Sequence, residues 1–262
     1  GKGTIELTNP LNDLGDSGVL TVTAANANMV DVDNVLLGAV DVTGTFSLSA
    51  GGDITQAARI LTGASNFTST GNVTLDNAAN SFGMFGATGK IISATSAGAL
   101  TISGINGAGN LTLTAGGHVT QTGPVIAVAK GALTTINAAG YDIVLNNLLN
   151  DSVTLTATAN NMILCDTNAL TLRDTKLSGD LELYALGDTS LFNNSVADST
   201  LLQSGGDIFG LDNTFGGDAD FTANDTIYFG GTGIHTFGGA TYFGGTQVEV
   251  NATGDLLLDG GN

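Results

Sequence analysis

The sequence predicts an all-β protein, a parallel β-helix in which short strands stack coil upon coil. One eleven-residue phrase, a strand followed by a glycine corner and a second strand, recurs along the chain. The chain has 39 Gly and only 2 Pro, with 42% apolar and 11% charged residues. This composition is too apolar for disorder and too rich in glycine for helices. Because parallel crossovers are almost always right-handed, we expect a right-handed β-helix.

Two sequence markers give the same long period. The last glycine of the recurring corner lies at positions 52, 117, 187 and 254, so successive copies are about 65 to 70 residues apart. The copies of the phrase are Phe46 to Gln56, Leu111 to Gln121, Leu181 to Leu191 and Val248 to Leu258. An asparagine-containing marker repeats with nearly the same steps, at Leu7 to Asn12, Leu75 to Asn80, Leu145 to Asn150 and Leu211 to Gly216. The two markers together predict one β-helix domain, 1–262, with super-repeats 1–71, 72–140, 141–206 and 207–262.

Each super-repeat has room for three coils of about 22 residues, so we expect roughly twelve coils in all. Strand-like pieces alternate apolar and small polar residues. In the first half they are Thr4 to Leu7, Val19 to Thr23, Met29 to Val32, Val40 to Val42, Thr45 to Leu48, Asp53 to Gln56, Val73 to Leu75, Ile91 to Ile92, Leu100 to Ile102, Leu111 to Thr114, Val119 to Gln121 and Val125 to Val128. The third super-repeat matches them, with Val153 to Thr156 corresponding to Val19 to Thr23. A helix-like fragment, Gln56 to Leu61, is too short to be stable alone.

The fourth super-repeat has an unusual aromatic content. It contains Phe-Gly-Gly at 215, 229, 237 and 243, and eight of the fifteen aromatic residues lie within 209–243. At about 22 residues per coil, Phe215 stacks on Phe237 and Phe221 on Phe243. We interpret these pairs as an interior ladder, and the alternative is an exposed sugar-binding platform.

The acidic composition limits the possible partners. The formal charge is −18, and most acidic residues are aspartates, which are common in corners. Such a surface repels phosphate backbones, so we expect no nucleic-acid partner. No run of 18 apolar residues occurs, so we expect no membrane insertion. Cys165, the single cysteine, follows an apolar stretch and is interpreted as a buried hydrophobe.

Candidate catalytic residues are few, and we expect that the protein is not an enzyme. Of the two histidines, His118 occupies the corner position that holds Asp53, Asp188 and Asp255 in other copies, which favours a turn residue. The other is His235. Glycoside hydrolysis needs two carboxylates beside one bond, which Asp218 with Asp220 or Asp31 with Asp33 could supply. The basic residues are scattered, at Lys2, Arg59, Lys90, Lys130, Arg173 and Lys176.

We predict no cofactor-binding or metal-binding residues. The nonapeptide calcium repeat is approached once, at Gly230 to His235, where histidine replaces the aspartate ligand. Adventitious calcium at Asp31, Asp33, Asp218 or Asp220 is compatible with their oxygen ligands.

The order of several segments resembles the repeats of filamentous haemagglutinin-type exoproteins. These segments are LDNAAN-SFG, LNNLLN-DS, VTLTATANNMIL, NALTL and GNLTLTAGGHVTQTG. The family consists of large bacterial surface adhesins, usually exported by two-partner secretion. The resemblance covers most of residues 1–206 and implies a right-handed parallel β-helix that serves as a rigid shaft. It supplies no catalytic residues, and the secretion domain of the family is not recognisable in the sequence.

The leading hypothesis is a structural or adhesive β-helical shaft of a secreted or bacterial cell-surface protein. It is expected to be a segment of a longer chain or a polymer subunit. Its expected partners are further coils or other copies, end to end in filaments or a surface layer, and host-cell or surface glycans. One alternative is a glycan-active or glycan-binding β-helix, with an acidic groove and outward aromatics around residues 209–243. Another is a calcium-dependent surface lattice.

Overall fold

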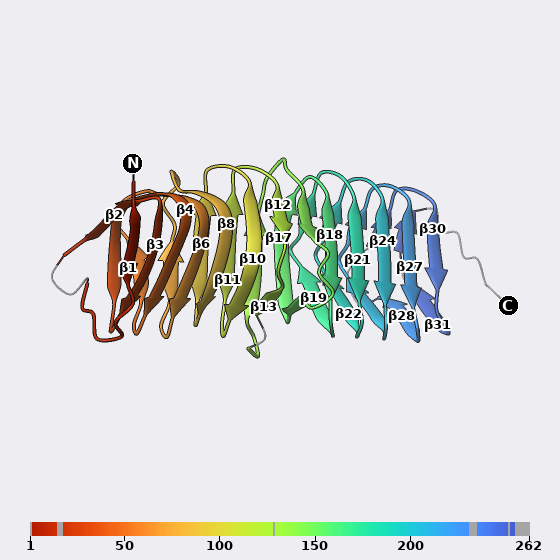
Figure 1. Ribbon diagram of the computed structural model, residues 1–262. Coiled ribbons are helices and arrows are strands. Elements are labelled where there is room, and N and C mark those ends of the chain that lie inside the picture. Colours follow the sequence, from red (N-terminus) through yellow and green to blue (C-terminus); the bar gives the residue numbers. More distant parts are fainter. Residues whose placement is uncertain (1, 15–17, 128, 231–234, 251, 255–262) are drawn as a thin grey trace. The chain divides into compact units, whose positions relative to one another are not determined.

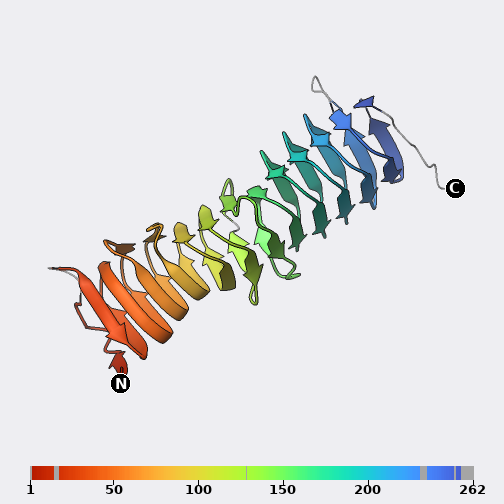
Figure 2. The same ribbon diagram turned by 90° about the horizontal axis from the view of Figure 1, so that it is seen from above.

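A computed structural model describes residues 2–14, 18–127, 129–230, 235–250 and 252–254. In these ranges the regular secondary structure is β-strand throughout, and no helix that could span a membrane occurs. The chain divides into two compact units, Gly1–Ala132 and Leu133–Asn262. Within each unit, strands of successive coils pair in parallel, one coil after another (Figures 1 and 2). The predicted all-β, parallel β-helical fold is confirmed.

The described residues of unit 1 form thirteen strands, several of them long. They are β1 (Thr4–Leu7), β2 (Leu20–Ala24), β3 (Asn26–Asp31), β4 (Val35–Ala50), β5 (Ile54–Gln56), β6 (Ile60–Ser69), β7 (Val73–Leu75), β8 (Ser81–Gly89), β9 (Ile92–Ser96), β10 (Leu100–Gly107), β11 (Leu111–Ala115), β12 (Val119–Gln121) and β13 (Val125–Ala127). The helix-like fragment 56–61 contributes to β5 and β6 instead, because its apolar residues fit into the parallel ladder.

Unit 2 contains shorter and more regular strands. They are β14 (Leu133–Asn137), β15 (Ile143–Leu145), β16 (Asp151–Ser152), β17 (Thr154–Ala159), β18 (Met162–Asp166), β19 (Leu170–Arg173), β20 (Lys176–Leu177), β21 (Leu181–Ala185), β22 (Thr189–Phe192), β23 (Ser195–Val196), β24 (Thr200–Ser204), β25 (Ile208–Leu211), β26 (Thr214–Phe215), β27 (Ala219–Ala223), β28 (Thr226–Phe229), β29 (His235–Phe237), β30 (Thr241–Gly244), β31 (Gln247–Val250) and β32 (Ala252–Gly254).

Most coils are shorter than the sequence predicts. In unit 1, Ile54 pairs with Val73, Val73 with Ile92 and Ile92 with Leu111, a step of 19 residues each time. In unit 2, β21, β24 and β27 also follow one another in steps of 19 residues. Steps of 22 residues occur where β27 pairs with β30 and β26 with β29. Two pairings in the aromatic-rich stretch therefore have the expected coil length, whereas Phe209 pairs with Tyr228 at 19 residues, as in most of the chain.

The long repeat of the sequence does not correspond to a whole number of coils. Leu111 begins one copy of the recurring phrase, yet it stacks in the column of Ile54, which lies in the second strand of an earlier copy. In unit 2, Val248 likewise stacks in the column of Thr189 rather than above Leu181. Each super-repeat thus moves the phrase to another face of the coil. The phrase can do so because it encodes a strand and a corner, not one particular face.

Alternate side chains of each strand point into a dry interior, as the period of two requires. Unit 1 packs Phe46, Phe67, Phe82 and Phe85 there, each at most 2% exposed. In unit 2, the predicted interior pairs are confirmed. Phe215 stacks on Phe237 with ring centroids 5.6 Å apart, and Phe221 on Phe243 at 5.4 Å. All four rings are buried.

Three copies of the asparagine-containing marker form the same turn. In each, the third residue of the marker is an Asn whose side chain accepts a hydrogen bond from the backbone N–H two residues on, as Asn77 does from Ala79 at 2.9 Å. The last Asn side chain donates to the backbone carbonyl five residues earlier, as Asn80 does to Leu75. The fourth copy differs, because Asn213 lies inside a corner and bonds Leu191 and Leu211. That copy is therefore not a fourth example of the turn.

Candidate functional site

Corner aspartates and asparagines hold neighbouring coils together. The side-chain oxygen of each accepts the backbone N–H of the residue 19 positions later, at 2.7 to 3.3 Å. We call this arrangement the corner ladder. Its acceptors are Asn26, Asn34, Asp53, Asn72, Asp142, Asn161, Asp180, Asp188 and Asp207. A carboxylate that accepts a backbone N–H makes a charge-assisted bond, so the five aspartates of the ladder use their negative charge in coil stacking.

Glycines complete the corner ladder. A Cβ at Gly71 would overlap the carboxylate oxygen of Asp53, and a Cβ at Gly206 would overlap that of Asp188. At these two positions only glycine leaves room for the acceptor of the coil below. The pattern of asparagine or aspartate at position i and glycine at i+18 is thus a sequence signal of the shorter coil. The long-period markers do not indicate this coil length.

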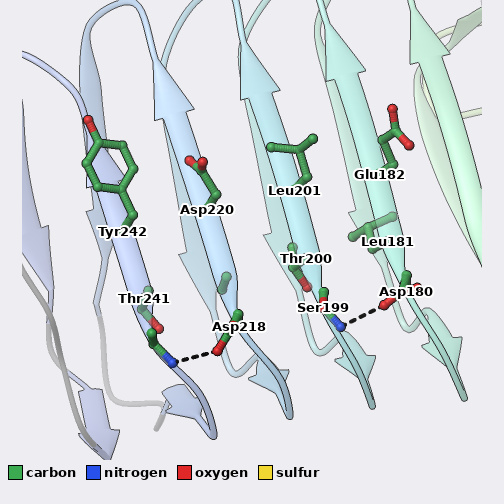
Figure 3. A pocket seen from close by; sticks show the side chains of 12 residues that line it. Asp180, Leu181, Glu182, Ser199, Thr200, Leu201, Asp218, Asp220, Thr241 and Tyr242 are labelled. Atoms are coloured by element: carbon green, nitrogen blue, oxygen red, sulfur yellow. Dashed lines mark hydrogen bonds between the residues drawn. The ribbon is translucent and has the colours of Figure 1, made fainter.

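An acidic groove of about 490 Å³ lies on the outer face of β21, β24, β27 and β30 in unit 2. Its acidic residues are Asp180, Glu182, Asp218 and Asp220. Glu182, Leu201, Asp220 and Tyr242 stand in one column, one per coil (Figure 3). Two coils separate Glu182 from Asp220, which corresponds to about 10 Å. Sequence analysis identified Asp218 and Asp220 and missed the others, because they come together only through the coil register.

Three carboxylates of the acidic groove already have structural partners. Asp180 accepts the N–H of Ser199 at 2.9 Å, and Asp218 accepts that of Ala240 at 2.9 Å (Figure 3). Asp220 accepts the Thr222 hydroxyl at 3.2 Å. The lining contains no basic residue. The groove therefore offers negative charge and apolar floor, but no cation that could stabilise a developing anion.

The second predicted carboxylate pair forms a turn. Asp31 is buried, and its two oxygens accept the backbone N–H groups of Leu14 and Asp33. Asp166 in unit 2 is also buried and accepts those of Ser152 and Asn168, at 2.9 and 3.1 Å. Burial raises the pKa of Asp166 to about 6, although the two backbone donors oppose that shift. Both aspartates end a strand and hold the loop that follows it.

The two histidines have different environments. The backbone carbonyl of His118 accepts the N–H of Leu100 at 2.9 Å, as the carbonyl of Asp53 accepts that of Val35 and Asp188 that of Leu170. The interpretation of His118 as a corner residue is thus supported, and Asp255 lies outside the described residues. His235 is fully buried, with its ring 5.0 Å from Phe229. Burial lowers the pKa of His235, which favours the neutral imidazole.

The remaining chemical candidates lie apart. Cys165 is buried, as predicted, and burial raises the pKa of its thiol. Lys2 pairs with Asp41 in unit 1, and Arg173 pairs with Asp174 in unit 2. Among the described residues, no group of three or more His, Cys, Asp or Glu is placed to hold a metal ion. The approach to a calcium repeat at 230–235 lies mostly outside the described residues.

Comparison with known proteins identifies a repeat family. No curated protein and no solved structure gives a significant match. A family profile described as "Repeats of unknown function (DUF5649)" matches twice, at residues 22–85 and 88–159, which together are just over half of the chain. The spacing between the starts of the two matches, positions 22 and 88, agrees with that of the sequence markers. The chain therefore belongs to the family of repeats of unknown function DUF5649.

Proposed function

We propose that the protein is structural: a β-helical shaft segment of a secreted or cell-surface bacterial protein, with no catalytic activity and no resident cofactor. The observation that supports this most is the use of the polar side chains. The corner ladder occupies five aspartates and four asparagines in coil stacking, and the buried Asp31, Asp166 and His235 lie within corners and core. At these positions, side chains that could perform chemistry are part of the structural framework instead.

The resemblance of the repeats to filamentous haemagglutinin-type exoproteins supports the location outside the cell. Antibodies raised against the purified chain test it on the source cells. We expect labelling of intact cells, with the labelled structure accessible to added protease. Labelling that appears only after the cells are permeabilised would contradict the proposal. A cytoplasmic protein from the same cells, probed in parallel, controls for lysis.

The partners we propose are further coils or other copies, joined end to end. Strand β1 pairs with β3 on one side, and Leu7 and Val19 near this edge are 39% and 51% exposed. An open edge of a parallel coil can accept another strand. Electron microscopy of the purified chain at rising concentration should show filaments that persist after a calcium chelator is added. Separate particles at all concentrations would contradict end-to-end assembly, and loss of filaments with chelator would favour the calcium-dependent lattice.

The acidic groove keeps one alternative open, a glycan-active protein. It has the predicted carboxylates and one outward ring, Tyr242, which is 38% exposed. The outward pair Phe209 and Tyr228 stacks face to face at 5.5 Å, so each ring covers a face that a sugar would need. The alternative predicts release of reducing ends from a polysaccharide and loss of that activity in Asp220→Asn. Our proposal predicts no release by either protein.

A further inference from the structure

A second hollow lies in unit 1, on the outer face of β6, β8 and β10. Its volume is about 300 Å³, at the lower end of the range for small-molecule sites. Two glycines form its floor, Gly86 and Gly104, which stack on each other in neighbouring coils. Asn66, Thr88, Ser103 and Asn106 surround the floor. We call this the neutral hollow.

The backbone keeps the floor of the neutral hollow bare. The register between β8 and β10 shifts between Ile102 and Gly104, which marks a β-bulge. Gly104 has a φ of 149°, where a residue with a side chain is strained, and a Cβ there would meet nothing within 4 Å. Glycine inside a strand often marks a place where another molecule approaches the backbone. The bulge therefore produces open space on a face that side chains would otherwise cover.

Polar side chains converge on this space from three coils. A Cβ placed on Gly86 would lie 2.8 Å from the Ser103 hydroxyl and 3.0 Å from the Asn66 amide oxygen. Thr88 pairs with Asn106 in the next coil, and both are exposed on the same face as Gly86. Among the described residues, no protein group hydrogen-bonds the side chains of Asn66, Thr88, Ser103 or Asn106. Their donors and acceptors are available to a ligand.

The charge of the lining indicates the chemical class of that ligand. In a chain with a net charge of −18, the neutral hollow contains no acidic and no basic residue. The outer columns that lead to it are also uncharged, with Ser47 before Asn66, and Ser49 and Thr68 before Thr88. Pro124 and Ile126 add an apolar flank. Amides and hydroxyls beside a small apolar surface complement a molecule rich in hydroxyl groups that also has C–H faces.

We propose that the neutral hollow binds a neutral saccharide. Asn66 and Asn106 bond its hydroxyl groups with their amides, Ser103 and Thr88 contribute hydroxyls, and Ile126 packs on its C–H surface. Acidic sugars are disfavoured, because the lining has no cation and the whole chain repels anions. The site lies in a different unit from the acidic groove and does not depend on the proposed shaft function.

A printed array of neutral, sialylated and sulfated oligosaccharides tests the proposal with the full chain. We expect retention of neutral oligosaccharides only. Asn66→Ala and Asn106→Ala should each weaken binding of the best neutral oligosaccharide about five- to tenfold, the effect of one lost hydrogen bond. Thr112→Ala is the matched control, because Thr112 is an exposed outward residue of β11 outside the neutral hollow.

Three outcomes would overturn the proposal: no neutral oligosaccharide retained, equal retention of sulfated ones, or unchanged binding by both asparagine variants. Hydrogen exchange of β6 and β10 shows whether each variant keeps the wild-type fold. Because the array uses purified protein, a negative result leaves the surface location untouched, and failure of surface labelling leaves the saccharide proposal untouched.

Discussion

The two units make sharp corners in different ways. In unit 1, long strands such as β6 and β8 continue around a corner at Gly63 and Gly83. A Cβ at Gly63 would lie 2.5 Å from the Thr43 carbonyl oxygen, and one at Gly83 would overlap the carbonyl oxygen of Gly63. The bare backbones therefore stack directly. We call this the glycine corner.

In unit 2, the strands are interrupted by a residue in the left-handed region, followed by a buried polar residue. Asp174, Asn193 and Asp212 have φ between 51° and 57°. The residues that follow them form a ladder, in which Thr175 donates its N–H to Asn194 and Asn194 donates to Asn213, both at 3.0 Å. We call this the asparagine corner.

The comparison shows two ways in which a β-helix can make a sharp corner. One uses glycines, which have no side chain, and the other uses an amide side chain that points into the core. The glycine corner brings backbones close, and a glycine has no side chain that could add a hydrogen bond. The asparagine corner supplies hydrogen bonds inside the core, where an unpaired polar group is costly. We therefore expect the asparagine corner to be the more sensitive of the two to substitution.

The largest effect is expected for Asn213→Ala. Asn213 is fully buried, accepts from the N–H and the amide of Asn194, and donates to the carbonyls of Leu191 and Leu211. Its loss leaves several buried groups unpaired, at a cost of about 3–5 kcal/mol. Hydrogen exchange should report that loss as faster exchange in β22 and β25.

Asn26→Ala in unit 1 is the matched control for Asn213→Ala. Asn26 is exposed and accepts only the N–H of Thr45, so we expect a cost of about 1 kcal/mol. Equal losses of stability in the two variants would show that burial of the amide does not determine how much a corner contributes to the free energy of unfolding.

A second, smaller effect concerns pH and Asp166. Its pKa is raised to about 6 in the folded protein, so between pH 4 and 6 the folded state binds more protons than the unfolded state. The contribution of Asp166 to stability is therefore highest at low pH and falls as pH rises through 6, by at most about 3 kcal/mol. The Asp166→Asn variant should lack this change.

The pH effect is measured as a difference between wild type and Asp166→Asn, because other acidic residues also contribute to the change of stability with pH. Local unfolding free energies from hydrogen exchange in β18, at pH 4.5 and pH 7.5, give that difference for wild type and Asp166→Asn. Asp31→Asn is the control for replacing a buried carboxylate that accepts two backbone N–H groups. Asp31 makes the same kind of hydrogen bonds as Asp166, but in unit 1. A change with pH that persists in Asp166→Asn would contradict the assignment.

Sequence reasoning predicted the fold class well, because the strand and corner phrase is local. Short strands such as 73–75 and 119–121 follow from alternation and flanking glycines, and the interior stacking of Phe215 on Phe237 follows from spacing. The sequence analysis did not predict the long strands β6 and β8, because a glycine inside an apolar stretch usually indicates the end of a strand. Here glycine is required at the corner that the strand crosses.

The sites could be predicted much less well. Glu182 and Asp220 lie two coils apart and share a groove only because each coil between them is 19 residues long. The long repeat suggested a longer coil, which places other residues side by side. The neutral hollow depends on a bulge between Ile102 and Gly104, which no local sequence pattern predicts. Pairing of asparagine or aspartate at i with glycine at i+18 would have given the 19-residue register, and with it the part of the acidic groove formed by β21, β24 and β27.

The last effect, smaller than that of Asn213→Ala, is expected at the glycine corner, from Gly83→Ala. The added methyl group would meet the carbonyl oxygen of Gly63, which is backbone and can move only with its strand. Overpacking of this kind costs about 1–3 kcal/mol. Gly98→Ala is the matched control, because a Cβ there meets nothing within 4 Å and should change stability by less than about 1 kcal/mol. If Gly83→Ala were as neutral as Gly98→Ala, the close backbone contact would not be what keeps a glycine at this corner.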